Sequence, residues 1–361
     1  MFRFLFLSIV FLFFIGCESS ELISLTLLFR HGSRAPRKVF DSDPYKSRIA
    51  EIWPEGLSQL TKLGKQQQYS LGLWYRQRYS EFIPEKYDPT FLRVLSSNKD
   101  RCLMSAAVNL AGLFPPKGEQ IWNSNIPWQP IPIHTSPIEQ DVLISNKRKC
   151  KKYEKLSEEL KDTYYYKKFM SDSKCLFDYL TKNIGENIST LDDATFVHDT
   201  FFIEDYFNLT LPNWSKKVFP VSTLPLLIQV FVLETNNTAL ARLKSGPLIN
   251  YITSFFEDVI KDPTNSQKLL MLSVHDSTLA HLMNTLQIYD GTWTEYASTL
   301  MFELRREKNT EFLNVYFKNS TMLRNIRFKE CNFDCPFEKF KEIVKPFRIT
   351  EQERETECLN V

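Results

Sequence analysis

The chain has 361 residues, of which 43% are hydrophobic and 24% charged, and its formal net charge is +2. This is an ordinary globular composition, long enough for one large domain or for a domain with an insertion. Because 45 basic residues nearly balance 43 acidic ones, the charge argues against a nucleic-acid or polyanion binder, and any strong electrostatic field has to be local.

The amino-terminal residues have the pattern of a secretory signal peptide. Arg3 precedes an apolar stretch over residues 4–15, and the small residues Gly16 and Cys17 follow. We therefore expect residues 1–17 to be a signal peptide. The apolar run is shorter than the roughly 18 residues that span a bilayer, which disfavours a membrane anchor, whereas Gly16-Cys17 leaves a bacterial lipoprotein signal open.

Five Asn-x-Ser/Thr sequons favour a eukaryotic secretory route and glycosylation. No later segment has the length and apolarity of a membrane span, so we expect a product that is secreted or soluble in a lysosome-like lumen. The candidate glycosylation sites are Asn187, Asn208, Asn213, Asn236 and Asn319.

Six cysteines follow the predicted signal peptide, in a compartment that permits disulfides. Cys331 and Cys335 enclose a short loop, and a metal site there would need two further ligands nearby, so a structural disulfide is the better interpretation. Spacing alone does not pair the other four, which are Cys102, Cys150, Cys175 and Cys358.

The apolar run at residues 21–29 predicts a buried parallel strand. It leads into the turn Arg30-His31-Gly32-Ser33-Arg34-Ala35-Pro36. Gly32 permits a sharp turn, and Pro36 prevents its continuation as a helix. Arginine binds phosphate oxygens with a planar fork, and a neutral imidazole can attack phosphorus, so the turn is suited to hold a phosphate. The alternative is a basic turn with one surface histidine.

A second strand is expected within residues 87–95, after an amphipathic helix of about five turns that begins near Gly56 and covers the sheet. Asn98 or Asp100 is the expected cap of the next helix, which ends before Pro115. Arg101 then lies at a helix amino terminus, where the helix dipole also favours an anion. An ordinary exposed arginine is the alternative.

Residues 123–242 differ from the flanking sequence in composition and pattern, with clustered prolines, lysine-rich helical patterns and few strand-like runs. We interpret this region as an inserted, mostly helical cap, with the α/β core formed by 18–122 and 243–361. His134 and His198 lie in the cap and could face a cleft and contact a substrate, although histidines in such positions more often have a structural or surface role. The lysine runs are most simply solvated helix faces.

Gly246-Pro247 is the expected start of the next helix, and residues 268–274 predict a third buried strand. That strand runs directly into His275-Asp276, and a helix is expected over 277–286. Residues 299–306 and 311–318 predict an antiparallel hairpin at one edge of the sheet.

Three strand ends therefore present charged groups that a parallel sheet would bring to one crevice. His31 is the candidate nucleophile and Asp276 the candidate proton donor, while the arginines and His275 would bind phosphate oxygens. No metal or cofactor is needed, because the arginines neutralise the phosphate. A carboxylic acid as proton donor predicts activity that favours acid solution. The phosphate-binding residues are Arg30, Arg34, Arg101 and His275.

Residues 30–36 resemble the Arg-His-Gly-x-Arg-x-Pro signature of the histidine acid phosphatases. Residues 96–116 are similar to the second conserved stretch of that family, and His275-Asp276 to its carboxyl-terminal His-Asp pair. The resemblance extends over about residues 22–358 and is closest to the lysosomal and prostatic type of animal enzyme.

The resemblance implies an α/β fold with a mixed, mostly parallel sheet covered by helices on both faces, a phosphoglycerate-mutase-like core and a helical cap. It implies a phosphohistidine on His31, with the phosphate-binding residues and proton donor named above. It also implies disulfides Cys150–Cys358 and Cys331–Cys335, and is compatible with a homodimer.

The sequence departs from the family in three respects. One family disulfide would require cysteines where Ile203 and Thr299 stand, so that bridge should be absent. Cys102 and Cys175 are left over, either as free thiols or as an unusual pair. The carboxyl-terminal membrane segment of the lysosomal type is also missing.

The expected function is acid hydrolysis of small phosphate monoesters. One alternative is a phytase-like phosphatase of inositol phosphates, which would need many basic residues in the cleft. The other is a catalytically weak or inactive small-molecule-binding member of the same fold, which the presence of every motif residue disfavours.

Overall fold

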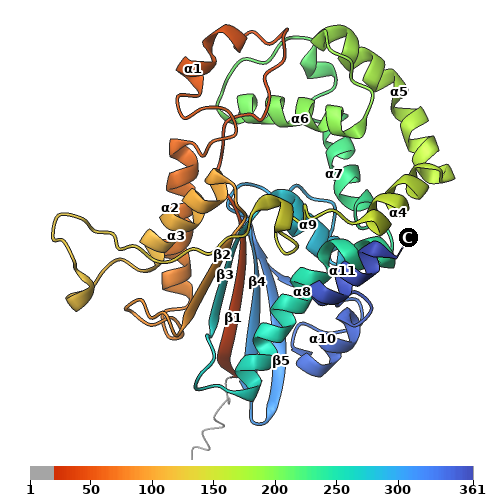
Figure 1. The fold of residues 1–361 in the computed structure, drawn as a ribbon. Helices are drawn as coiled ribbons and strands as arrows, with labels where there is room; N and C mark the ends of the chain where they lie inside the picture. Colours follow the sequence, from red (N-terminus) through yellow and green to blue (C-terminus); the bar gives the residue numbers. More distant parts are fainter. Residues whose placement is uncertain (1–19, 361) are drawn as a thin grey trace, which may run out of the picture.

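A seven-stranded mixed sheet runs through the structure, a computed structural model that describes residues 20–360 (Figure 1). The predicted signal peptide, 1–17, lies outside the described residues. Within residues 20–360 no helix has the length and apolarity needed to cross a membrane. The strands are, in spatial order, β2 (Leu92–Ser96), β3 (Leu269–Val274), β1 (Glu21–Arg30), β4 (Thr299–Glu307), β5 (Thr310–Lys318) and β6 (Leu323–Ile326), with β7 (Cys335–Pro336) paired to β5.

The sheet confirms the expected mixed α/β architecture. β2, β3 and β1 are parallel, so their carboxyl ends meet at one edge, as predicted. β4 is antiparallel to both β1 and β5. Parallel pairing is therefore confined to the three strands that carry the predicted site. The expectation of a mostly parallel sheet is wrong, because the other strand pairs, β1–β4, β4–β5, β5–β6 and β5–β7, are antiparallel.

Helices cover both faces of the sheet (Figure 1). Leu25, Leu27 and Phe29 of β1 point to one face and pack under α2 (Lys62–Arg78) and α3 (Asp100–Leu113). Leu28 belongs to the core on the other face. That core lies beneath α8 (Thr238–Lys261), α9 (Asp276–Thr285) and α10 (Phe337–Val344). Because both faces are buried, β1 has an apolar run rather than a strict alternation.

The region predicted as a cap contains helices and no named strand among its described residues. In Figure 1 its helices α5, α6 and α7 lie beyond one end of the sheet. The division of the chain into core and cap stays a prediction, and α8 runs across the expected boundary at 242/243. The helices are α4 (Lys151–Lys161), α5 (Tyr164–Ile184), α6 (Leu191–Tyr206) and α7 (Thr223–Leu233).

The expected helix start at Gly246-Pro247 is wrong, because both residues lie inside α8. A proline inside a helix leaves the carbonyl four residues earlier without its amide donor. That carbonyl belongs to Leu243, and it accepts a hydrogen bond from Nε of Arg354 at 3.0 Å and from the Asn146 amide at 3.2 Å. Distant side chains thus replace the bond that Pro247 removes.

Two smaller expectations are also corrected. The residue at the N-cap of α3 is Lys99, and no side chain caps this helix, so neither Asn98 nor Asp100 has the expected role. The β4–β5 hairpin is not at an edge, because β4 pairs with the central strand β1 and β6 lies beyond β5. A sequence pattern identifies the hairpin but does not reveal which strands flank it.

Two disulfides join the chain as expected. Cys150, just before α4, is bonded to Cys358 of α11 (Glu351–Leu359), and Cys331 is bonded to Cys335. The leftover Cys102 and Cys175 are free thiols, the first buried and the second exposed.

Candidate active site

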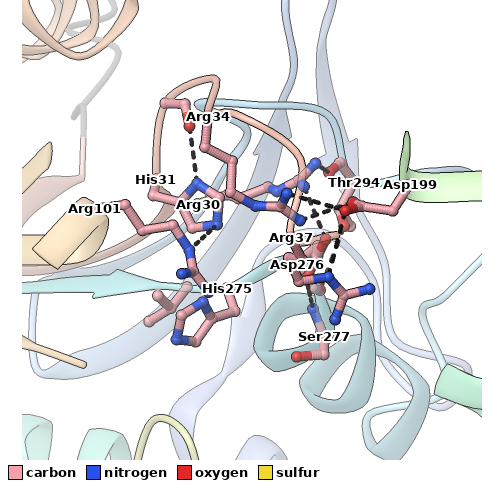
Figure 2. A network of polar contacts seen from close by, with 12 residues as sticks. Arg30, His31, Arg34, Arg37, Arg101, Asp199, His275, Asp276, Ser277 and Thr294 are labelled. Atoms are coloured by element: carbon pink, nitrogen blue, oxygen red, sulfur yellow. Dashed lines mark hydrogen bonds and ion pairs between the residues drawn. The ribbon is translucent and has the colours of Figure 1, made fainter. Parts of the chain in front are cut away.

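The three parallel strand ends converge on one cleft of about 600 Å³. Arg30, the last residue of β1, is in register with Val274, so His31 and His275 both follow directly after paired residues. Their rings are 5.7 Å apart. Figure 2 shows these side chains with Arg101, which the first turn of α3 presents to the same space. The cleft lining includes His31, Arg34, Arg101, His275 and Asp276.

His31 is held in one tautomer by its own turn. Its Nδ1 lies 2.8 Å from the carbonyl oxygen of Gly32, and since a carbonyl can only accept, Nδ1 carries the hydrogen. Nε2 therefore has the lone pair, and it accepts a hydrogen bond from Nε of Arg101 at 3.1 Å. Burial, followed by the positive charges of Arg101 and Arg30, holds the pKa of His31 well below its usual value. This lowered pKa favours the neutral imidazole.

Close backbone packing fixes this turn. A Cβ atom on Gly32 would lie 2.2 Å from the carbonyl oxygen of Gly64, near the start of α2. The Gly32 amide also donates to Oγ of Ser105 in α3 at 3.1 Å. No larger residue fits at Gly32 without displacing α2.

Arg30 is fully buried and is oriented by a loop that the sequence analysis did not identify. Its guanidinium donates to the carbonyl of Thr294 at 2.6 Å and lies 4.2 Å from the ring centroid of Tyr296 and 5.0 Å from that of Trp293. It also forms an ion pair with Asp276 at 2.8 Å. The aromatic residues Trp293 and Tyr296 could have indicated a contact with an arginine. No local pattern, however, shows that this arginine is Arg30, more than 260 residues earlier.

Arg34 is paired with a carboxylate that the sequence analysis also missed. Its two terminal nitrogens donate to Asp199 of α6 at 2.7 and 3.0 Å, and Arg37 lies 3.4 Å from the same group (Figure 2). Burial would raise the pKa of Asp199, but Arg34 and Arg37 outweigh it and lower the pKa. Nε of Arg34 is buried and has no hydrogen-bond partner among residues 20–360, so this donor is available to an anion in the cleft.

His275 and Asp276 lie at the amino terminus of α9, which begins at Asp276. Burial, followed by the charge of Arg101, lowers the pKa of His275 to about 3. Burial alone would raise the pKa of Asp276, but Arg30, Arg34 and Arg37 reverse this effect and hold the pKa far below its usual value. Three arginines therefore act on one carboxylate, an arrangement that suits an incoming phosphate.

Comparison with known proteins gives the same assignment as the motifs. A family model described as the histidine phosphatase superfamily (branch 2) matches residues 21–213. Bos taurus prostatic acid phosphatase is 36% identical over 352 residues, which cover 95% of this chain and 89% of the relative. The chain belongs to the histidine phosphatase superfamily.

Two further comparisons agree with this membership. Xenopus laevis lysosomal acid phosphatase is 36% identical over 348 residues, covering 94% of this chain and 79% of the relative. The structure of Hafnia alvei phytase has a TM-score of 0.68 at 16% identity, covering 94% of this chain and 98% of that one. The latter likeness concerns the fold alone.

Away from His31, the cleft of this histidine phosphatase is lined by further charged residues that sequence reasoning did not connect with the site. Glu234 lies 2.5 Å from Nζ of Lys244 and 3.3 Å from Nε2 of His281. Of the lysines in 147–168, only Lys147 lines this cleft, together with Lys99 from the β2–α3 turn.

The two cap histidines of this histidine phosphatase are not among the residues that line the cleft. His134 is exposed and forms an isolated bridge with Leu95. His198 is buried, with Nδ1 at 2.9 Å from Oγ1 of Thr223 and its ring near Trp293. His134 is thus a surface histidine and His198 a buried, hydrogen-bonded one, as the interpretation of a structural or surface role expected.

Proposed function

We propose that this protein is an acid phosphatase that hydrolyses phosphate monoesters through a phosphohistidine on His31. The observation that supports it best is the neutral His31 ring, whose Nε2 lone pair lies beside Arg101 in the cleft. The similarity to prostatic and lysosomal acid phosphatases supports the same activity.

In the first step Nε2 of His31 attacks phosphorus, and the bond between phosphorus and the ester oxygen breaks. Arg30, Arg34, Arg101 and His275 bind the non-bridging oxygens as their charge increases. Asp276, protonated in the complex, gives its proton to the departing alkoxide, and an alcohol leaves.

In the second step Asp276, now a carboxylate, accepts a proton from water. The water oxygen bonds to phosphorus as the phosphorus–Nε2 bond breaks, so inorganic phosphate leaves and neutral His31 is restored. The three arginines neutralise the phosphate throughout, and the proposal involves no metal or cofactor.

Hydrolysis of p-nitrophenyl phosphate near pH 5 by the chain without residues 1–17 tests the activity. We expect turnover that His31→Ala abolishes, and a phosphoryl group on His31 in enzyme quenched with alkali, because the phosphorus–nitrogen bond is labile in acid. A folded parent protein that binds phosphate but turns over no ester would instead support the inactive small-molecule-binding alternative.

Asp276→Asn assigns the proton donor. We expect turnover of esters with poor leaving groups to fall by about 10²–10⁴, the usual contribution of a general acid. With p-nitrophenolate, which leaves without a proton, a phosphorylation burst on His31 should persist. An equal loss for good and poor leaving groups contradicts the role of Asp276.

Inositol phosphates are a second candidate substrate class. Lys99 and Lys147 line the cleft, and neither has an ion pair within the described chain, so both can contact further phosphate groups. A panel of nucleotides, sugar phosphates, lipid phosphates and inositol phosphates distinguishes the candidates. Preference for inositol phosphates that Lys99→Ala and Lys147→Ala reduce would favour the phytase-like activity.

The proposed setting is outside the cell or in a lysosome-like lumen. Asn187, Asn208, Asn213 and Asn236 are exposed, as glycosylation requires, whereas Asn319 is half-buried and its side-chain amide contacts Glu295. Glycosidase digestion and the amino-terminal sequence of the secreted protein test glycosylation and removal of 1–17. Sedimentation tests the proposed homodimer.

A further inference from the structure

The His275 ring is held at one edge by a chain of two serine hydroxyls. Its Nε2 lies 2.9 Å from Oγ of Ser97, and the same Oγ lies 2.8 Å from Oγ of Ser145. Ser97 is fully buried and is not part of the cleft lining, whereas His275 and Ser145 line the cleft. The Nε2 edge of the ring is therefore turned toward the protein.

The other nitrogen of His275 is the one available to a ligand. Nδ1 has no oxygen or nitrogen partner within the described chain; the Cys102 sulfur lies 3.7 Å from Nδ1 and 3.8 Å from Nε2. This sulfur packs against the ring without selecting one nitrogen. Figure 2 shows the ring beside Arg101 and close to His31, where the phosphate is proposed to bind.

A neutral imidazole carries one hydrogen, and the hydroxyl chain can run in two directions. If Ser145 donates to Ser97 and Ser97 donates to Nε2, the hydrogen is on Nδ1. If Nε2 donates to Ser97, Nδ1 presents a lone pair to the cleft. A phosphate oxygen attracts a donor and repels a lone pair, so only the first direction supports phosphate binding.

We propose that Ser97 is a positioning residue which, supported by Ser145, holds His275 with its hydrogen on Nδ1, so that Nδ1 donates to a phosphate oxygen. The inference rests on the proposed phosphatase function for its significance, but it concerns equilibrium binding of phosphate and can be tested without turnover. Burial and Arg101 keep the ring neutral, which is why its tautomer matters.

Calorimetric binding of inorganic phosphate to the folded protein at pH 5 is the first test. Ser97→Ala should weaken binding roughly tenfold, the effect of one lost hydrogen bond to a charged ligand. Ser97→Thr, which keeps the hydroxyl, should restore most of the affinity. Ser24→Ala is the matched control. Ser24 is as buried as Ser97 but lies in the first half of β1, away from the Arg30 end where the cleft is, so this change should leave the affinity unchanged.

Ser145→Ala tests the chain independently of the folding of Ser97 variants, because Ser145 is only partly buried. It removes the donor to Ser97 and should weaken phosphate binding in the same direction, by two- to fivefold. Unchanged phosphate affinity in both Ser97→Ala and Ser145→Ala overturns the proposal.

Nitrogen NMR of histidine-labelled protein gives a readout that a merely structural role would not change. The chain has 5 histidines, so the His275 signals can be assigned by their loss in His275→Gln. With phosphate bound, His275 should show a protonated Nδ1 and an unprotonated Nε2, and Ser97→Ala should shift the ring toward the other tautomer. A protonated Nε2 in the parent complex overturns the proposal, whereas absent ester turnover would overturn only the phosphatase function.

Discussion

Asp276 lies in surroundings that oppose the role proposed for it. Arg30 pairs with it, and together with Arg34 and Arg37 it holds the pKa of the carboxyl far below its usual value, so the free enzyme has a carboxylate at pH 5. A phosphate ester has a second pKa near 6 and enters acid solution as a monoanion. The substrate can therefore bring the proton that Asp276 later donates, while its own charge offsets the arginines.

This origin of the proton predicts how kcat/KM depends on pH. Above about pH 6 the monoanionic ester is lost, so kcat/KM should fall about tenfold per pH unit. Below pH 6 the profile should change less, because burial and the neighbouring arginines hold the pKa of His31 below its usual value and the arginines do the same for Asp276. Initial rates between pH 4 and 8 check this, and a rate that rises steadily toward alkaline pH contradicts it.

Glu204 is a second buried carboxyl group, with 1% of its surface exposed. Burial, reinforced by the neighbouring Asp43, raises its pKa to about 9. The group is therefore protonated in the folded protein but ionised in the unfolded chain above its ordinary pKa. Its contribution to stability is complete in acid solution and declines as pH rises from about 4.5 to about 9.

Glu204→Gln should remove this pH dependence. The parent protein should lose up to about 1.4 kcal/mol of unfolding free energy per pH unit through this group, whereas the amide loses nothing. The melting temperature of Glu204→Gln should thus equal that of the parent near pH 4.5 and exceed it at pH 7. A constant difference at every pH contradicts the raised pKa.

Helix α6 is an element that links the predicted cap to the turn at residues 30–36. It begins with a capping box between Thr190 and Asp193, which fixes its amino terminus. Two turns later, the Asp199 carboxylate accepts hydrogen bonds from both terminal nitrogens of Arg34. The orientation of Arg34, in the turn that follows β1, thus depends on a side chain 165 residues further along the chain.

Asp199→Asn tests this dependence. Removing one partner of a buried ion pair leaves Arg34 uncompensated, so the unfolding free energy should fall by about 3 kcal/mol. Inorganic phosphate supplies a negative charge to the same guanidinium and should raise the melting temperature more in this variant than in the parent. Asp205→Asn, an exposed change on the same helix, is the control, and an equal response to phosphate in all three proteins contradicts the interpretation.

At the scale of the whole molecule, the carboxyl-terminal helix α11 is bonded to two distant parts of the chain. The Cys150–Cys358 bond joins α11 to the residue before α4. Arg354 of α11 donates a hydrogen bond to the Leu243 carbonyl, which lacks its helical amide donor because of Pro247. The second bond, Cys331–Cys335, closes a loop with a sequence separation of only 4, against 208 for the first.

The two bonds should therefore contribute unequally to stability. In the chain-entropy account, a cross-link restricts the unfolded chain more when its loop is longer, which gives about 5 kcal/mol for the first bond and about 2 kcal/mol for the second. Urea unfolding of Cys150→Ala/Cys358→Ala and of Cys331→Ala/Cys335→Ala at one pH measures the difference. Equal losses contradict this account.

Local patterns in the sequence were sufficient for the strands that carry the site. β1 and β3 are predominantly apolar because both of their faces are buried, and each leads into residues predicted for phosphate chemistry. Parallel pairing then brings His31 and His275 together without further information.

Tertiary structure alone decided how those residues are held. The partners of Arg30, Arg34 and His275 come from distant loops and helices, and no periodicity or spacing records which side chains meet across such separations. The same limit explains the mistaken helix start at Pro247, whose cost is offset by Arg354 and Asn146. The sequence by itself determined which groups could do the chemistry, whereas long-range packing decided their charge, tautomer and orientation.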